Sequence, residues 1–183
     1  MSLFLKRINY DSRRVEDLDA DFKSLLSSLV GNMQSKFGLK FFPFFTLRGV
    51  GTQAKLWARN RSVGVRDGEA DKVEKAGAPW LASLIRKAPA AVDPHWVTNA
   101  LPGQSWHQYG LAADLVNDLG GGQLNWGGKP GTAADEAYVK LANEAVLVGL
   151  TSGRGFGDSV HVQLPKAAKP PYTWAEMEKM FKP

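Results

Sequence analysis

Two short segments of this chain carry residue types that bind metal ions in proteins. His107 and Asp114 lie seven residues apart, and His161 follows much later in the chain. Two imidazoles and one carboxylate form a common zinc set, which leaves one coordination position for water. Zinc polarises a carbonyl group and lowers the pKa of the bound water. Hydrolysis also needs a proton-transfer group, and Asp158, three residues before His161, is a candidate.

Residues 111–116 are expected to form a strand that carries Asp114. Because alternate side chains of a strand point to opposite faces, Asp114 shares a face with the small residue Ala112. A carboxylate on such an apolar face is costly to bury unless it is paired or binds a metal. Gly110 permits a bend that could bring His107 beside Asp114. A salt bridge to Asp114 is the alternative interpretation.

Residues 159–164 are expected to form a second strand, with His161 and Gln163 on one face. A single histidine on a strand is more often a core or surface residue than a ligand. The chain also lacks the His-Glu-x-x-His helix that marks many zinc peptidases. A two-histidine, one-carboxylate iron site is a further alternative. The six residues between His107 and Asp114, and the helical content, do not favour it.

The composition is that of one globular domain. The chain has 183 residues and no cysteine, so any metal site must use histidine and carboxylate ligands. The net charge of +5 suits an anionic partner, but no dense Lys/Arg block indicates nucleic acid binding. No apolar stretch is long enough to span a membrane, and the N-terminus does not resemble a secretory signal peptide.

Hydrophobic spacing predicts an α+β protein with one domain. Residues 61–78 are polar and contain glycine, and they are expected to form an exposed loop. Proline at residue 43 indicates an edge strand or an irregular start. Helices are expected over 13–37, after 49 with Thr52 at its cap, after Pro79, over 133–148, and after Thr173, and a strand is expected over 41–47.

These motifs resemble those of the D-alanyl-D-alanine carboxypeptidase and L-alanyl-D-glutamate endopeptidase family of zinc peptidases. The family pattern Ser-x-His-x-x-Gly-x-Ala-x-Asp is met in full over residues 105–114, and Asp-x-x-His is met over 158–161. The stretch 48–57 resembles a family segment with arginine, then glutamine and a hydrophobic helix. The resemblance covers about residues 40–165 and implies a small antiparallel sheet flanked by helices, the hedgehog/DD-peptidase fold.

The resemblance implies specific roles for five residues. His107, Asp114 and His161 would bind one zinc ion, and Asp158 would be the general base and acid. Arg48 would stabilise the developing oxyanion, which its permanently charged fork suits. The alternative for Arg48 is a buried structural arginine.

Four more residues are weaker candidates for the site. Gln53 could support Arg48 or simply pack, and Ser105 could hydrogen-bond near the metal or begin a turn. Trp106 and Trp126 are candidates for substrate contact, although tryptophans are more often core residues. His95 has no assigned role, and a surface loop is its expected position.

Two departures from the family pattern affect the substrate pocket. Family members often have Trp-Gly-Gly before the last motif, where this chain has the segment 152–156, and residues 62–100 are longer than in compact relatives. A catalytic domain is expected over 1–165, followed by a proline-rich tail over 166–183 whose short helix docks on the domain.

The expected function is hydrolysis of peptidoglycan stem peptides at the L-alanyl–D-glutamyl bond, as in phage endolysins. The alternatives are a D-alanyl-D-alanine carboxypeptidase and a non-catalytic zinc-containing binding module. The expected partner is bacterial peptidoglycan, without nucleic acid binding or membrane insertion, and a monomer is expected. The protein is expected to be made in the cytoplasm without a signal peptide and to act on the cell wall.

Overall fold

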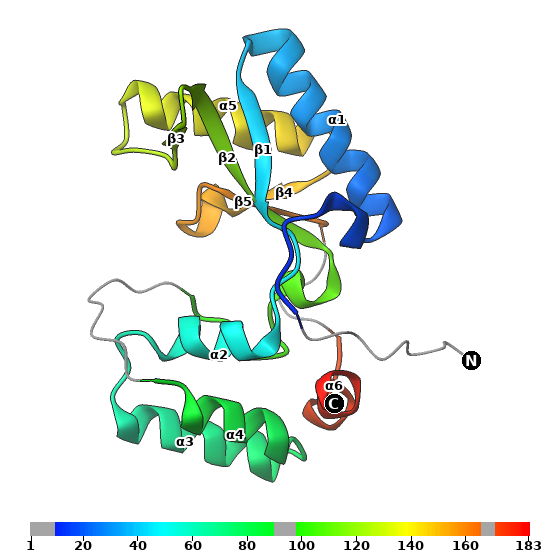
Figure 1. Ribbon diagram of the computed structural model, residues 1–183, viewed down its shortest axis with the longest axis vertical. Helices are drawn as coiled ribbons and strands as arrows, with labels where there is room; N and C mark the ends of the chain where they lie inside the picture. The colour runs from blue at the N-terminus through cyan, green and yellow to red at the C-terminus, as the bar shows by residue number, and fades with distance from the viewer. Residues whose placement is uncertain (1–9, 90–97, 166–170) are drawn as a thin grey trace. The chain divides into compact units, whose positions relative to one another are not determined.

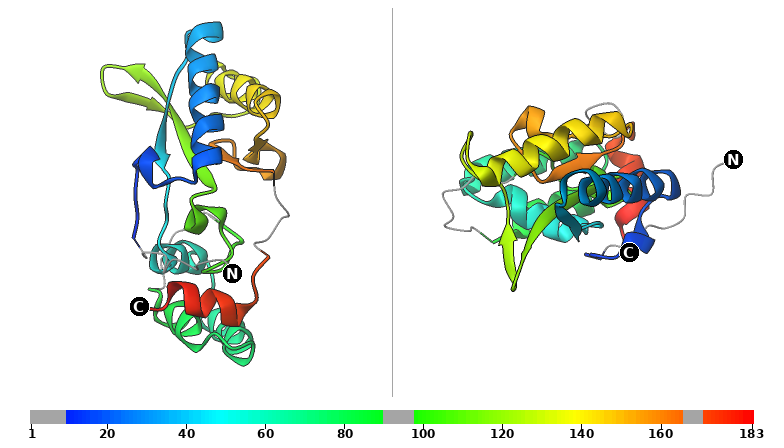
Figure 2. Two further views of the ribbon diagram at one scale, coloured as in Figure 1. Left: turned by 90° about the vertical axis from the view of Figure 1, so that its right-hand side faces the viewer. Right: turned by 90° about the horizontal axis from the view of Figure 1, so that it is seen from above.

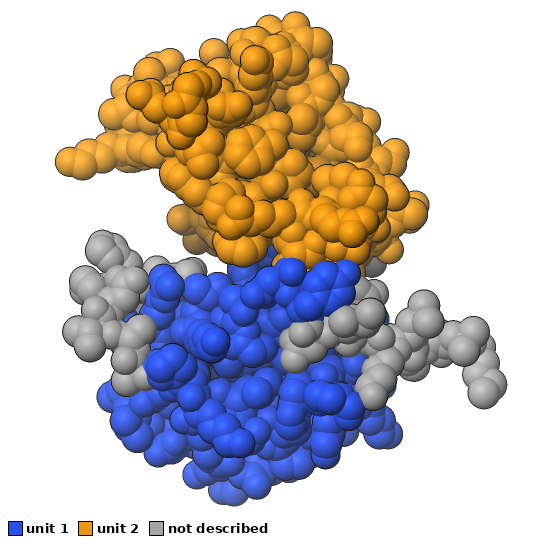
Figure 3. Space-filling view, viewed as in Figure 1, with its two compact units in different colours: residues 1–11, 48–108, 167–183 blue, residues 12–47, 109–166 orange. Residues whose placement is uncertain are grey.

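The computed structural model describes residues 10–89, 98–165 and 171–183, so His95 lies outside the described residues. The described chain contains six α-helices and one five-stranded sheet (Figure 1). It divides into two compact units, shown in Figure 3. Unit 1 comprises Met1–Asp11, Arg48–Gln108 and Ala167–Pro183, and unit 2 comprises Ser12–Leu47 and Tyr109–Lys166.

Unit 2 contains the whole sheet. The strands are β1 (Lys40–Phe45), β2 (Ala112–Gly120), β3 (Gln123–Asn125), β4 (Thr151–Ser152) and β5 (His161–Gln163). They run in the order β1-β2-β5-β4, with β3 paired to the far end of β2, and every pairing is antiparallel. The predicted α+β class is therefore confirmed. Pro43 lies in β1, at the edge of the sheet, where its missing N–H costs no ladder bond.

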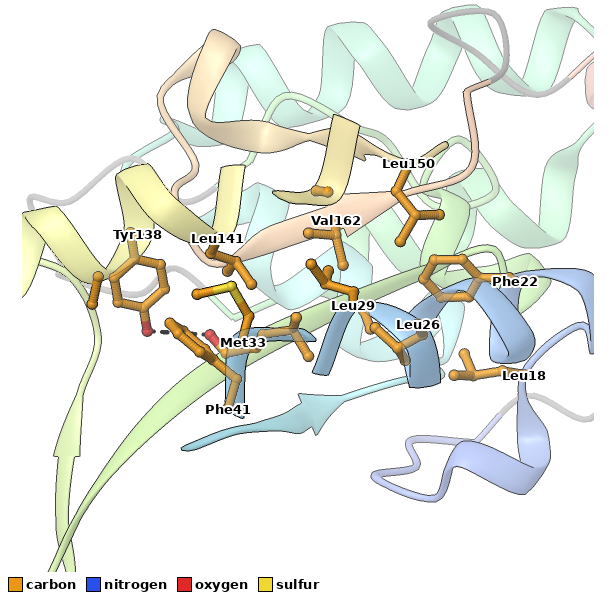
Figure 4. Close-up of a cluster of buried hydrophobic side chains, with 14 residues drawn as sticks. Leu18, Phe22, Leu26, Leu29, Met33, Phe41, Tyr138, Leu141, Leu150 and Val162 are labelled. Carbon is orange, nitrogen blue, oxygen red and sulfur yellow. Dashed lines mark hydrogen bonds between the residues drawn. The ribbon is translucent and has the colours of Figure 1, made fainter. Parts of the chain in front are cut away.

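Helices α1 (Ala20–Phe37) and α5 (Ala133–Leu147) cover one face of this sheet (Figure 2). Their apolar side chains pack on the strand residues that point to that face, as Figure 4 shows. Tyr138 also donates its hydroxyl to the carbonyl oxygens of Leu115 and Asn125. This core contains Phe22, Leu26, Leu29, Met33, Phe41, Ala113, Leu115, Tyr138, Leu141 and Val162. The residues that alternate with these along the strands therefore point to the opposite face.

The predicted helix over 13–37 begins later than expected. Asp19 is the N-cap of α1, and its side chain accepts hydrogen bonds from the backbone N–H groups of Asp21 and Phe22. A short 3-10 turn, η1 (Val15–Asp17), precedes it. Gly38 ends the helix in the left-handed conformation, as expected. Helix α5 begins after Thr132 as predicted, because the Thr132 hydroxyl caps the Asp135 N–H group.

Unit 1 is helical. It contains α2 (Val50–Ala58), α3 (Val63–Lys75), α4 (Pro79–Lys87) and α6 (Trp174–Phe181). The Glu178 carboxylate of α6 accepts hydrogen bonds from the Trp80 and Leu81 N–H groups, which joins α6 to the N-terminus of α4. The capping box predicted at the start of α6 is present. No helix in the described part of the chain is long and apolar enough to cross a membrane.

Two predictions in unit 1 are wrong. Most of residues 61–78 form helix α3 (Val63–Lys75) rather than an exposed loop, because Ser62 caps the helix and three buried residues suffice to anchor it. Two of these, Ala70 and Val73, are apolar, but the third is Arg66, so hydrophobic spacing gave little signal. Helix α2 is capped at Gly49, and the Thr52 hydroxyl instead donates to the Asp11 carboxylate.

Gly110 is required where the chain enters β2. Its φ of +68° is in the left-handed region, and a Cβ there would lie 3.1 Å from the Asp17 carbonyl oxygen and 3.2 Å from the Asp19 nitrogen. The Gly110 carbonyl oxygen accepts a hydrogen bond from that same Asp19 N–H group. The turn between His107 and Asp114 is therefore fixed against the start of α1.

We expect Gly110→Ala to lower the free energy of unfolding by about 2–4 kcal/mol, from strain and crowding together. The matched control is Gly120→Ala, since Gly120 has a φ of +82° but open space around its Cα. The control should lose only about 1–2 kcal/mol. Denaturant unfolding measures both, and equal losses would contradict the close packing of Gly110.

Candidate metal centre

Three buried side chains form the candidate metal centre. His107 lies in the 3-10 turn η2 (Trp106–Tyr109) that leads into β2, Asp114 lies in β2, and His161 begins β5. Asp114 and His161 are directly paired across the two strands. One potential ligand atom from each of the three residues lies within 4.8 Å of the other two. His107 is only 1% exposed, and this cluster could hold a metal ion.

The donor set and spacing fit a small divalent cation. Tetrahedral zinc has ligand atoms about 2.0–2.2 Å from the metal, which places neighbouring ligand atoms about 3.3–3.6 Å apart. The His161 Nδ1 and Asp114 Oδ1 atoms are 3.2 Å apart, and the third ligand is within reach of a side-chain adjustment. Without a metal ion, the negative charge of the buried Asp114 carboxylate could be balanced only by protonation of the neighbouring His107 or His161 imidazole.

Gln163 holds the His161 ring from the side away from Asp114. The His161 Nε2 atom lies 2.9 Å from the Gln163 Oε1 atom. When Nε2 carries the proton and donates it to this oxygen, the Nδ1 lone pair faces Asp114 and is available to a metal. Such outer contacts fix the tautomer and orientation of histidine ligands. The sequence placed Gln163 on the ligand face but did not indicate this role.

The pKa of His161 is raised. Burial of the ring on its own lowers this pKa, but the hydrogen bond and negative charge of Asp114, the hydrogen bond to Gln163 and the charge of Asp158 together outweigh burial. In the metal-free protein the imidazolium therefore stabilises the fold below pH 6.5, and this contribution is lost as the pH rises through the raised pKa. A bound metal takes the place of that proton, so metal binding weakens in acid.

Gly153 allows the segment before His161 to approach the ligand. A Cβ at Gly153 would overlap the Asp158 carbonyl oxygen and would lie 2.7 Å from the His161 Cβ atom. The Asp158 N–H group donates to the Gly153 carbonyl oxygen at 2.9 Å, which closes the turn around η3 (Gly153–Phe156). The segment that departs from the family pattern thus keeps a glycine where the chain passes His161.

Asp158 and Phe156 lie beside the ligand His161. Asp158 is half-buried, its carbonyl oxygen accepts the His161 backbone N–H group at 3.3 Å, and its charge contributes to the raised pKa of His161. The Phe156 ring is 62% exposed and meets the His161 ring edge to face, with 5.7 Å between the ring centroids. The turn that carries Asp158 and an exposed aromatic ring therefore lie next to this candidate ligand.

Arg48 and Gln53 interact with each other in unit 1. The Arg48 guanidinium donates to the Gln53 Oε1 atom at 3.4 Å, and the buried Gln53 amide donates to the Ala100 carbonyl oxygen at 2.7 Å. The two interpretations of Gln53 were that it supports Arg48 or that it only packs. The side chain is buried and also accepts a hydrogen bond from Arg48, so it does both. The backbone N–H group of Arg48 also donates to the backbone carbonyl oxygen of His107 at 3.4 Å.

Ser105 and Trp106 are buried around turn η2. The Ser105 carbonyl oxygen accepts the Gln108 N–H group, and the Gln108 side chain accepts the Ser105 N–H group, so Ser105 begins this turn. Trp106 is 6% exposed, which favours a core role over substrate contact. Trp126 is 47% exposed. A separate cavity of about 570 Å³ in unit 1 is lined by Trp57, Arg61 and Trp174, among others, and by none of the candidate site residues.

Comparison with models of known protein families found no match to this chain, and comparison with curated proteins found none. The family resemblance therefore rests on the motifs over 105–114 and 158–161, and it stays a prediction.

Replacement of Gln163 tests whether it orients a metal ligand. We expect Gln163→Ala to weaken metal binding by roughly 10–100-fold, because His161 loses the acceptor that fixes its ring. The control is Thr151→Val, which changes the residue paired with Gln163 on β4 and leaves the His161 contact in place. Competition with a chromogenic chelator measures both affinities, and unchanged binding by Gln163→Ala would rule out this role.

Proposed function

We propose that this protein is a zinc peptidase that hydrolyses the L-alanyl–D-glutamyl bond of peptidoglycan stem peptides. The observation that carries the proposal is the buried cluster of His107, Asp114 and His161, with the backbone of Asp158 hydrogen-bonded to the backbone of His161. Three protein ligands leave a position for water in catalytic zinc sites, whereas structural zinc sites usually have four.

Zinc held by these ligands would supply Lewis-acid chemistry, polarising the scissile carbonyl group and lowering the pKa of water. In this proposal Asp158 accepts the proton of the attacking water at its carboxylate and returns it to the leaving amine. Its place in a turn closed by the Gly153 carbonyl oxygen, beside His161, supports this role. A module that only bound its ligand would not need this carboxylate.

Arg48 is proposed to stabilise the negative charge that develops on the carbonyl oxygen. A guanidinium cannot lose its charge at physiological pH, and it offers several N–H donors in one plane. Gln53 supports the guanidinium because its Oε1 atom accepts a hydrogen bond from one of these N–H groups. The Gln53 amide N–H in turn donates to the Ala100 carbonyl oxygen, which holds Gln53 in place. These contacts restrict the rotamers of Arg48, which favours preorganisation.

The substrate and the setting come from the family resemblance. The sequence pattern over 105–114, the α+β class and the small antiparallel sheet support a hedgehog/DD-peptidase fold. We propose that the protein acts on bacterial cell wall as a monomeric phage-type endolysin. The net charge of +5 is compatible with an anionic wall polymer.

Purified peptidoglycan tests this proposal. The protein is incubated with several wall types, with and without chelator, and mass spectrometry identifies the released ends. We expect new alanine C-termini and glutamate N-termini, lost with chelator and restored by zinc. Asp158→Asn should cut at least about 100-fold more slowly while retaining its metal, because only the proton-transfer group has changed.

Glu136→Gln is the control, since Glu136 is an exposed carboxylate on α5, which packs on the face of the sheet opposite the ligands. It should cut at the wild-type rate. Release of free D-alanine would instead identify a carboxypeptidase. A zinc-loaded protein that binds wall but cuts none of the types would contradict the enzyme proposal and favour a binding module.

A further inference from the structure

An arginine and three aromatic rings form a platform on the face of the sheet that carries the metal ligands. The platform consists of Arg13, Phe44, Phe45 and Trp126. The Arg13 Cζ atom lies 4.1 Å from the centroid of the Phe44 ring and 5.7 Å from that of Phe45. The Phe44 ring meets the Trp126 ring edge to face, with 4.6 Å between centroids. The core drawn in Figure 4 occupies the other face.

A bulge in β1 places this platform next to the ligands. The register shifts between Pro43 and Phe45, so Phe44 is the extra residue and Phe45 pairs with Asp114. Asp114 in turn pairs with His161. Paired residues on antiparallel strands share a face and have Cα atoms about 4.5–5.5 Å apart. The Arg13 guanidinium therefore lies beside the ring of Phe45, the residue of β1 that pairs directly with Asp114.

Backbone hydrogen bonds hold Arg13 in this place. The Ser12 N–H group donates to the Leu47 carbonyl oxygen, and the Thr46 N–H group donates to the Ser12 carbonyl oxygen, both at 3.0 Å. The Thr46 hydroxyl donates to the Arg14 carbonyl oxygen. This segment therefore runs beside the end of β1, where the Arg13 guanidinium lies over the Phe44 ring and beside the Phe45 ring.

The Arg13 charge is available to a ligand. Arg13 is exposed, and among the described residues the nearby carboxylates have other partners. Asp11 accepts the Gly49 N–H group and the Thr52 hydroxyl, and Asp17 accepts the Ser12 hydroxyl. A guanidinium that lies over an aromatic ring still has its in-plane N–H groups available for hydrogen bonds. Two of these groups match the spacing of the two oxygens of a carboxylate.

We propose that Arg13 binds the free carboxylate of the glutamyl residue that follows the scissile bond. Glutamate has two carboxyl groups, of which the continuing peptide uses one, so the other remains ionised near the cut. Phe44 and Trp126 would support the guanidinium and cover the apolar part of the peptide. The inference rests on the proposed function and extends it to a residue outside the family motifs.

The test compares two synthetic stem peptides that differ only in this carboxylate, which is free in one and amidated in the other. We expect wild-type kcat/KM to favour the free carboxylate by roughly 10–100-fold, the usual range for a hydrogen bond to a charged group. Arg13→Gln should bring the ratio close to one, mainly through a higher KM for the carboxylate peptide. Arg14→Gln is the control, because Arg14 is adjacent and exposed but pairs with Glu16.

The same ratio in wild type and Arg13→Gln would overturn the inference, while cleavage would still support the proposed function. If neither peptide is cut, the proposed function fails, and calorimetric binding of the two peptides to the zinc-loaded protein decides the inference. A preference for the carboxylate that Arg13→Gln abolishes would then support it. Equal binding of both peptides, or no binding, would overturn it.

Discussion

The buried carboxylate of Asp114 is the constraint on which the site depends. Removing a carboxylate from water costs several kcal/mol unless nearby positive charge compensates for it. Here the strand pairing places His161 directly opposite, with 3.2 Å between Nδ1 and Oδ1, and His107 completes the cluster. Either a proton on an imidazole or a metal ion can balance the charge. The raised pKa of His161 reflects the first state, and a metal would replace its proton.

One face of the sheet carries the hydrophobic core, and the other carries the candidate metal cluster. Helices α1 and α5 bury one face with Phe41, Leu115 and Val162, while the alternate residues Asp114 and His161 lie on the other. The bulge in β1 brings Phe45 to that second face, where it pairs with Asp114. A shift of one residue in the register of β2 or β5 would send Asp114 or His161 into the core, so the hydrophobic packing itself keeps these candidate ligands in place. Gly110 and Gly153 add the close approaches that a side chain would prevent.

The three residues of the candidate metal cluster could be selected from the sequence because their placement depends on local spacing and strand alternation. Asp114 and His161 were placed on strands, and a bend was expected at Gly110; β2 and β5 are present, and Gly110 has a positive φ. Helix α3 was missed because it is anchored by Arg66, Ala70 and Val73, which give almost no apolar periodicity. The contacts of Gly153 and Arg13 join residues that spacing does not bring together. Alternation places Gln163 and His161 on one face of β5, but it does not show that the two side chains bond.

The most direct measurement is the zinc content of the purified chain after it is stripped with chelator, reloaded with zinc and freed of excess ion. Wild type is compared with Asp114→Asn, which removes one ligand charge without changing side-chain size. The control is Asp118→Asn, in which the changed residue lies on the same strand and pairs with Lys40. The metal site described here predicts one zinc ion per chain in wild type and in Asp118→Asn, and none in Asp114→Asn. Equal zinc in all three proteins, or none in any of them, would contradict it.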